Sequence, residues 1–376
     1  MKTVWETGHM TPIIENYDII VCGGGPAGLC AAVRAGREGC KVLLIEERGT
    51  LGGTWTAGLM TWIMDADNKK GIFLELVERV ESSGSLYRIG EKDHSFLPED
   101  MKYLMEQLAE EAGVVLMYHA SVVAVLKEDG EELPQITGVI AESRSGRQAY
   151  GAKIIIDATG DGDVAFHAGC GYDVGSEHHS IQPMSMIALI AGLQLADVKD
   201  YCLNEEAFPG QAQENFHELF RRHGIEISYA MPVLTHLQGE VFSLSINHQY
   251  HVQCDNAMEL TKATIDGRRE IADTVRRLKK VDSAWKNVVL VQTSEAIGVR
   301  EGRRIHGRYC LTKEDLEEGK QFTDGICNVT FNVDIHEEQA DGTGSWQDGG
   351  IMVKPYQIPL RDSSRCFRII ISRKTD

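Results

Sequence analysis

The chain has 376 residues, 43% of them hydrophobic and 25% charged, as expected for a globular protein of about two domains. Its formal net charge of −18 argues against a surface that follows nucleic-acid phosphates, so we expect no nucleic-acid partner. Residues 1–16 lack the apolar core of a signal peptide, and no apolar run approaches the ~20 residues that span a bilayer. We therefore expect a cytoplasmic protein without a membrane span.

The first informative stretch predicts a strand, a glycine turn and a helix. Tyr17–Cys22 is apolar without alternation, which is typical of a strand buried on both faces. Gly23, Gly25 and Gly28 follow in the pattern G-x-G-x-x-G, which suits a tight turn, a close backbone approach to a pyrophosphate and close packing of the next helix. The helix expected over residues 27–38 would direct its N–H groups and positive dipole end at the phosphates.

A second strand and an acidic residue complete this unit. Lys41–Ile45 is expected to form a second buried strand, and Glu46 stands at its end, 18 residues after Gly28. That offset is close to the ~20 residues expected for a carboxylate that binds a ribose hydroxyl. Gly52 and Gly53 then offer a second backbone approach to a dinucleotide. The glycine motif by itself leaves both a nicotinamide and a flavin dinucleotide open.

The runs GGGPAG and IEERGTLGGTWTAGL resemble the FAD-binding fingerprint of the FAD-dependent oxidoreductases with the glutathione-reductase-type fold. Within that family the chain is similar to proteins related to the flavin subunit of heterodisulfide reductase. The resemblance implies FAD as cofactor and an α/β fold: a Rossmann-like FAD-binding domain, with a parallel central sheet and a small antiparallel layer, and an inserted α+β substrate domain. The implied FAD contacts in this stretch are Gly23, Gly25, Ala27, Gly28, Glu46, Gly52, Gly53 and Thr54.

Further elements are expected before residue 154. Trp55 and Trp62 would either wall the flavin or belong to the core. The pattern predicts amphipathic helices and short strands, namely helices over 71–83 and 99–113, strands over 114–118 and 121–127, and a hairpin of 137–142 with 148–153. In the resembled fold a backbone group at Val122 contacts the adenine.

A third buried strand is expected at Ile154–Ile156, followed by the run DATGDGD. This run resembles the family's A-T-G-D motif, a strand end that returns to the FAD, and implies contacts from Ala158, Thr159, Gly160 and Asp161. Its aspartates also suggest a calcium loop, but the EF-hand pattern with its distal glutamate is absent, so we expect no metal.

Residues 184–288 are expected to form a substrate domain inserted into the FAD domain, because apolar segments alternate there with polar ones and with a long helix. That helix, over residues 257–280, would bury Ile265, Ile271, Ala272, Val275 and Leu278. No second dinucleotide motif occurs, which argues against a separate NAD(P)H domain. The expected organisation is a lead-in over 1–16, the FAD domain over 17–183 and 289–361, the insertion, and an atypical tail over 362–376.

The return segment, residues 289–309, resembles the family's run I-G-x-R-E-x-R-R-I-x-G. The forked, permanently charged side chain of Arg300 is suited to hold a substrate oxygen. Arg303 and Arg304 are interpreted as structural, and an internal ion-pair network with Glu301, Glu295 and neighbouring aspartates is the alternative for all three. In the later run DIH, which also resembles a family signature, His336 is the candidate acid–base group or hydrogen-bond donor, with a packed or solvated histidine as the alternative.

The nine cysteines are scattered without any C-x-x-C, so no redox disulfide or iron–sulfur ligand run is expected from local spacing. The chain follows the family pattern Y-x-I-P-x-R up to Arg361. Residues 361–376 then carry five basic and two acidic side chains, and no glycine for the family's next turn. We expect a frameshift or premature stop to have replaced a helix that faces the flavin. The alternative is a family variant with a short strand over 367–372.

These features together predict an FAD-dependent oxidoreductase. We expect it to transfer a hydride between the flavin and a small, anionic metabolite and to use an unidentified electron donor or acceptor, because the cofactor does the chemistry while the protein supplies position and charge. The alternative is a flavin-binding protein that is truncated or depends on a partner, without turnover of its own. The sequence leaves the substrate and the oligomeric state open.

Overall fold

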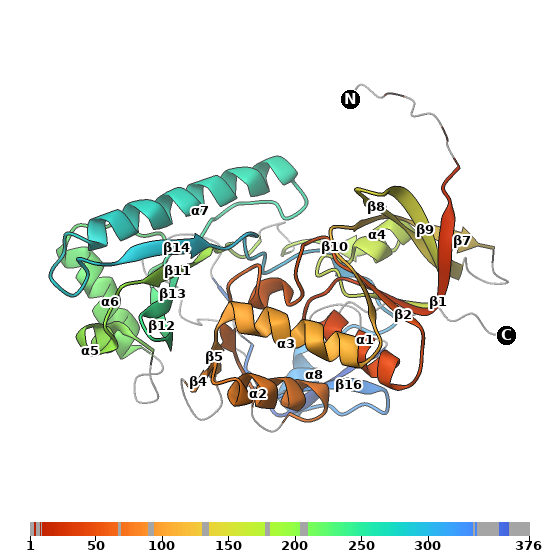
Figure 1. The fold of residues 1–376 in the computed structure, drawn as a ribbon, viewed down its shortest axis with the longest axis horizontal. Coiled ribbons are helices and arrows are strands. Elements are labelled where there is room, and N and C mark those ends of the chain that lie inside the picture. The colour runs from red at the N-terminus through yellow and green to blue at the C-terminus, as the bar shows by residue number, and fades with distance from the viewer. Residues whose placement is uncertain are drawn as a thin grey trace.

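The computed structural model describes residues 4, 8, 10–66, 69–88, 94–129, 135–176, 181–203, 210–333, 335–336 and 353–360. It contains two main sheets that lie side by side, each with its own helices (Figure 1). The larger sheet has six strands in the order β6-β2-β1-β9-β8-β7, and the smaller has four in the order β12-β13-β11-β14.

The six-stranded sheet is parallel over four strands and antiparallel over two. The parallel strands are β6 (Val115–Met117), β2 (Val42–Ile45), β1 (Ile13–Cys22) and β9 (Gly146–Asp157). The antiparallel strands β8 (Gln135–Ser143) and β7 (Ser121–Glu128) continue the sheet beyond β9. A parallel sheet with a glycine turn after its first strand is the Rossmann-like α/β fold, so the predicted fold class is confirmed.

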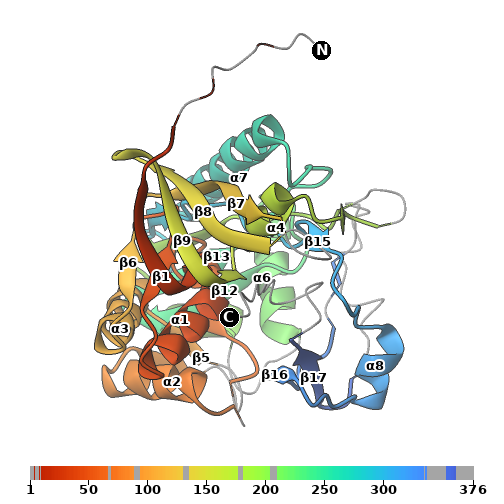
Figure 2. The same ribbon diagram turned by 90° about the vertical axis from the view of Figure 1, so that its right-hand side faces the viewer.

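Helices cover both faces of this sheet, which explains its apolar strands. Val21 and Leu44 pack in the core under α1 (Pro26–Arg37), α2 (Ile72–Ser82) and α3 (Pro98–Glu111), whereas Ile20 and Leu43 pack in a second core that includes Val164 of α4 (Asp163–Ala168). Figure 2 shows the sheet above α1, α2 and α3. A small sheet of β3 (Trp62–Ile63), β5 (His94–Phe96) and β4 (Leu86–Arg88) precedes α3.

Two predicted strand boundaries differ from the structure. The segments expected as a hairpin strand over 148–153 and as a buried strand over 154–156 form one continuous strand, β9. Residues 146–151 pair with β8 and residues 149–157 pair with β1, so the two pairings overlap and no turn separates the two segments. For the same reason β1 begins at Ile13 rather than Tyr17, because β9 extends far enough to pair with these earlier residues.

The four-stranded sheet is fully antiparallel and consists of β12 (Val233–Gln238), β13 (Val241–Ser245), β11 (Ile187–Ala191) and β14 (Val289–Thr293). Its helices are α5 (Leu195–Val198), the 3-10 turn Lys199–Tyr201, α6 (Gln211–Arg222) and α7 (Ala257–Leu278). Phe216 and Trp285 stack in the core between the sheet and these helices. Because β14 pairs with β11, the sheet extends past residue 288, where the sequence suggested a domain boundary.

The buried face of α7 differs in part from the predicted one. Ile271, Val275 and Leu278 are buried as expected, but Ile265 is 49% exposed. The helix turns its Gly267 and Ala263 toward the core, four and eight residues before Ile271 respectively, and Ile265 lies off this face.

The last described elements are short. They are β10 (Tyr172–Asp173) paired with β15 (Arg304–Ile305), α8 (Lys313–Glu318), and β16 (Gly325–Val329) paired with β17 (Tyr356–Pro359). Thr312 caps α8: its Oγ1 accepts from Asp315 N at 3.3 Å, and Asp315 Oδ2 accepts from Thr312 N at 3.1 Å. The atypical tail over 362–376 lies outside the described residues. Within the described chain, no helix has both the length and the apolar character to cross a bilayer.

Candidate functional site

Three predicted cofactor segments meet at the carboxyl ends of β1, β2 and β9, which are neighbours in the sheet. Ala158 N donates to Cys22 O at 2.7 Å, which joins the turn after β9 to the end of β1. Gly52 N donates to Gly24 O at 2.8 Å, which joins the glycine doublet to the first glycine turn. Ligands bind at the carboxyl ends of parallel strands in open α/β sheets. These contacts therefore bring the first glycine turn, the glycine doublet and the turn after β9 together in a binding site of the expected kind, which we call the cradle.

The positions of the first turn need glycine for different structural reasons. A Cβ on Gly28 would lie 1.9 Å from Gly23 O, and Gly23 itself has φ +99°, so both are required by the fold. Gly25 is different: it has φ −66° and caps the N-terminus of α1, and a Cβ there would meet nothing within 4 Å. The backbone of Gly25 therefore faces open space beside the helix N-terminus, which fits the pyrophosphate of a dinucleotide.

Gly53 lies against the same place, since a Cβ on it would come within 3.3 Å of Gly25 Cα. It belongs to a 3-10 turn, Gly53–Trp55, in which Thr54 is exposed. Trp55 packs against Phe96 with ring centroids 6.2 Å apart, which supports the core interpretation of that tryptophan. Trp62 lies in β3.

Glu46 is buried at the end of β2 and holds the first turn. Its Oε2 accepts from Gly24 N at 2.6 Å, and its Oε1 accepts from Arg48 N at 2.8 Å. Burial raises the pKa of Glu46, against the opposite effect of the two backbone hydrogen bonds. Each carboxylate oxygen can accept more than one hydrogen bond, so both are suited to ribose hydroxyls.

The turn after β9 is fixed by Asp157, which the sequence did not single out. Its buried carboxylate accepts from Thr159 Oγ1 at 2.7 Å and from Ala165 N at 2.9 Å. Burial is the main cause that raises the pKa of Asp157. Thr159 Oγ1 also accepts from Asp163 N at 2.8 Å, so its hydroxyl is used inside the turn. A contact of Thr159 with FAD would then come from its backbone.

The predicted adenine contact lies slightly away from this cradle. Val122 is within β7, where it pairs with Ala141. Ala120, two residues earlier, donates its N–H to Glu46 O at 3.1 Å. The turn at His119 and Ala120 therefore contacts the Glu46 loop directly. It is a second candidate, beside Val122, for contact with the adenosine part of FAD.

Arg300 lies in a second cluster, formed where three segments converge. Ser185 and Gly298 exchange backbone hydrogen bonds of 3.2 and 2.7 Å. Arg300 donates through Nη1 to Pro183 O and to Ser185 Oγ at 3.0 Å. Its Nη2 lies 3.4 Å from Nε2 of His248. The guanidinium is thus held by the segments around residues 184, 248 and 299.

His336 joins the same cluster through its ring and its backbone. The ring packs edge-on against His248, with centroids 5.1 Å apart. Its backbone N donates to Gln182 Oε1 at 2.8 Å, and Gln182 Nε2 donates to Glu301 Oε1 at 3.1 Å. Both predicted catalytic residues therefore contact His248, which sequence analysis missed. The available signal was weak: His248 follows the apolar run of β13 by three residues, in the polar sequence NHQYH.

The other two arginines of the return segment make structural contacts. Arg303 donates to Asp163 Oδ1 at 2.8 Å and to Asp161 O at 3.1 Å, and its guanidinium lies 4.3 Å from the ring centroid of Phe166. Arg304 donates to Gly175 O. The described contacts of Glu301 are to Gln182, whereas Arg303 forms its ion pair with Asp163, one of the neighbouring aspartates of the alternative network.

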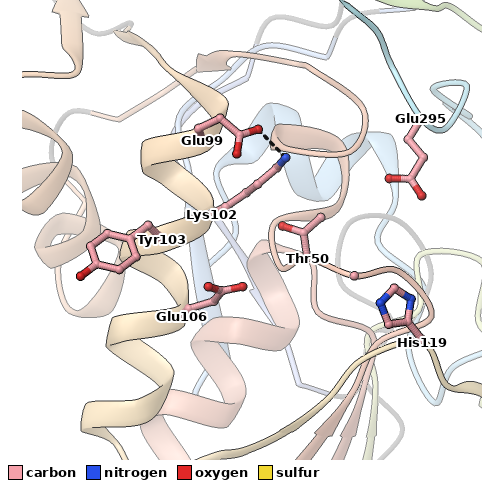
Figure 3. A pocket seen from close by; sticks show the side chains of 8 residues that line it. Thr50, Glu99, Lys102, Tyr103, Glu106, His119 and Glu295 are labelled. Atoms are coloured by element: carbon pink, nitrogen blue, oxygen red, sulfur yellow. Dashed lines mark hydrogen bonds and ion pairs between the residues drawn. The ribbon is translucent and has the colours of Figure 1, made fainter.

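Two pockets lie near these clusters, and one of them includes the predicted FAD contact Asp161. A polar pocket of about 480 Å³ opens between α3 and the loop at Thr50, with His119 and Glu295 on the opposite side (Figure 3). None of the predicted cofactor or catalytic residues lines it. A smaller pocket of about 220 Å³ is lined by Asp161, Asp163, Cys254 and Arg303, among others. No group of three or more potential metal ligands is found in the described part of the chain.

The parallel sheet and its glycine cradle define a dinucleotide-binding α/β protein. Residues 18–362 match the model of the family described as FAD dependent oxidoreductase. This match covers most of the chain, so the chain belongs to the FAD dependent oxidoreductase family and FAD is its cofactor. The open backbone at Gly25, the glycine contact with Gly53 and the buried Glu46 fit that group.

Two curated relatives match over short stretches. The chain is 52% identical over 50 residues to a dihydrolipoamide dehydrogenase from Chaetomium thermophilum, which is 13% of this chain and 10% of that protein. It is 53% identical over 45 residues to a glutathione reductase from Schizosaccharomyces pombe, which is 12% of this chain and 10% of that protein. The chain thus matches about a tenth of the length of these relatives.

Solved structures match a larger share of the chain, but at lower sequence identity. A p-nitrophenol 4-monooxygenase from Pseudomonas putida has a TM-score of 0.48 at 11% identity, and the match covers 79% of this chain and 71% of that one. A geranylgeranyl bacteriochlorophyll reductase-like protein from Thermoplasma acidophilum has a TM-score of 0.47 at 17% identity, with 77% and 66% covered. The likeness to the heterodisulfide reductase subunit stays a prediction.

Proposed function

We propose that this enzyme transfers a hydride between FAD and a small, anionic metabolite, with Arg300 holding an oxygen of the metabolite and His336 handling its proton. The observation that carries the proposal is the convergence of these two residues on His248. They are 36 residues apart in the sequence and come from separate segments. Permanent positive charge beside an imidazole is the combination that a carboxylate substrate with an exchanging proton requires.

The position of the return segment supports a location beside the cofactor. Glu295 N donates to Ala57 O at 2.9 Å, just after the glycine doublet. Arg303 donates to Asp161 O at 3.1 Å, in the turn after β9. Arg300 lies between these two attachments in the sequence, and each attachment is next to a cradle segment.

Each part of the chain then has a defined task. The backbone around Gly25 and Gly53 would hold the pyrophosphate, and Glu46 would hold the ribose. FAD, when bound, supplies the hydride chemistry. Arg300 stays charged at every physiological pH, and Pro183 and Ser185 hold one of its terminal nitrogens, Nη1, before a ligand arrives. His336 is half-buried, and its backbone N donates to Gln182 Oε1, which holds the residue beside His248.

Anaerobic bleaching of the bound flavin tests this function. The FAD-loaded enzyme is mixed with a panel of small hydroxy acids, and each acid is paired with its neutral amide as a matched control. We expect at least one acid to bleach the flavin absorbance and its amide to do so about tenfold more slowly or worse, since the amide lacks the charge that Arg300 recognises. Equal rates for acid and amide would contradict the anionic substrate. Stable FAD that no panel member bleaches would favour the alternative of a flavin-binding protein without turnover.

A further inference from the structure

The inference concerns His248, a buried imidazole that lies between the two proposed catalytic residues. Its ring lies against the guanidinium of Arg300 and the ring of His336. Tyr229 also packs against it, with ring centroids 4.0 Å apart. On its other side, Nδ1 lies 3.2 Å from Tyr250 Oη. The imidazole is only 3% exposed, so these neighbours rather than water set its state.

The partner on Nε2 decides the protonation state of this ring. A guanidinium has donors only, so Nε2 must accept the hydrogen bond from Arg300 Nη2. The ring proton then resides on Nδ1, which donates to Tyr250 Oη. A doubly protonated ring would place two donors face to face at 3.4 Å. Burial, followed by the charge of Arg300 and then by His336, lowers the pKa of His248 to about 2, in agreement with this neutral form.

The backbone of His248 is fixed by a separate set of contacts. His248 N donates to Ser228 Oγ at 2.9 Å, and Ser228 N donates to Glu270 Oε1 at 2.6 Å. Next to it, Asn247 Oδ1 accepts from Met186 N at 3.0 Å, and Asn247 Nδ2 donates to Met186 O at 3.1 Å. Both the backbone and the ring of His248 are therefore fixed by contacts, as expected for a residue that orients another.

We propose that His248 is a positioning residue: its neutral imidazole accepts a hydrogen bond from Arg300 and so fixes the guanidinium in the orientation that binds an anionic ligand. The proposal rests on the proposed function of Arg300. His248 holds no proton for the reaction, because its Nε2 lone pair is engaged and its Nδ1 proton is donated to Tyr250. It acts on the ligand only through Arg300.

The test uses oxalate, a small dicarboxylate, titrated into the FAD-loaded protein by calorimetry. In His248→Phe the ring and its packing on Tyr229 are kept but the acceptor is lost, and we expect the dissociation constant of oxalate to rise about tenfold. His248→Gln returns an acceptor near the position of Nε2 and is expected to stay within about threefold of the wild type. In an Arg300→Ala background, in which we expect oxalate to bind more weakly, His248→Phe is expected to raise the dissociation constant no further.

The outcomes separate this proposal from the proposed function. If His248→Phe binds oxalate as the wild type does while Arg300→Ala does not, His248 is no positioning residue and the anion site stands. If the wild type does not bind oxalate, or if Arg300→Ala binds it as tightly as the wild type, the proposed anion site is wrong. The proposed role of His248 is then wrong as well. FAD content and thermal midpoint report folding. Should His248→Phe fail to fold, His248→Gln decides, and a tenfold loss there would overturn the proposal.

Discussion

Individual residues of the cradle divide between those that build the turn and those that leave room for a ligand. Gly23 and Gly28 belong to the first kind, because added side-chain atoms would collide with neighbouring backbone. Gly25 belongs to the second kind. Glu46 does both, since its carboxylate holds Gly24 N and retains acceptor capacity for a ligand. Substitutions at these positions should therefore affect folding and FAD binding to different degrees.

The first prediction concerns Gly25→Val. Its backbone is extended and its Cβ position is open, so we expect a folded protein whose unfolding free energy changes by less than about 1 kcal/mol. The β-branched side chain would occupy the place where the pyrophosphate approaches, so bound FAD should be lost. The contrasting variant is Gly28→Ala, which should destabilise the fold by about 2 kcal/mol or more through its clash with Gly23 O. Stoichiometric FAD in purified Gly25→Val would show that the cofactor site is elsewhere.

The second prediction concerns Glu46→Gln, which keeps the shape of the side chain and removes its charge. We expect the binding of FAD to weaken by about 1–3 kcal/mol, because a charge-assisted hydrogen bond to the ribose is replaced by a weaker one. Titration of the apoprotein with FAD gives this dissociation constant. A value equal to that of the wild type would mean that Glu46 serves only the turn at Gly24.

At the level of elements, local sequence patterns predicted most of the fold. The βαβ unit, the long helix α7 and the capped helix α8 all depend on neighbours in the sequence, and the structure has them. The continuous strand β9 was missed because its length depends on pairing with β1 and β8. His248 was missed because only the tertiary fold brings it to Arg300. Residue type and spacing cannot indicate such a contact.

The three helices under the main sheet are joined by an ion-pair network, which gives the third prediction. Glu75 of α2 accepts from Arg37 of α1 at 2.7 Å and from Arg79 at 2.7 Å, and Arg79 also reaches Glu111 of α3. The hydrogen bond from Arg37 is the largest cause that lowers the pKa of Glu75, from its ordinary value of 4.5 to about 2. A lowered carboxyl pKa means stability that is present above 4.5 and lost as the pH falls toward 2.

We therefore expect Glu75→Gln to be less stable than the wild type by about 1 kcal/mol at neutral pH. This difference should shrink as the pH falls from about 5 toward 2, because Glu75 takes up a proton first in the unfolded chain and only near its lowered pKa of about 2 in the folded protein. Denaturant unfolding of both proteins across that range measures it. A difference that stays constant over the range would show that the ion pairs do not contribute.

At the level of the whole molecule, the two sheets meet around the proposed site. Leu59, just after the glycine doublet, packs against Ile187, Leu189 and Leu237 of the second sheet. The segment from Glu295 to Arg303 leaves that sheet and is bonded at both ends to cradle segments. The second sheet thereby carries Arg300 and His248 to the FAD-binding part. We infer that its role is to supply the substrate groups, while the first sheet supplies the cofactor groups.

The most direct test of this account is flavin reduction in Arg300→Ala, expressed per bound FAD, with an acid that bleaches the wild-type enzyme. The matched control is Arg308→Ala, which removes an exposed arginine from the same segment. We predict that Arg300→Ala keeps its FAD but loses at least about a hundredfold in the rate of flavin reduction, whereas Arg308→Ala behaves as the wild type. Loss of FAD in proportion to activity in Arg300→Ala would instead show that Arg300 is structural, and would contradict the account.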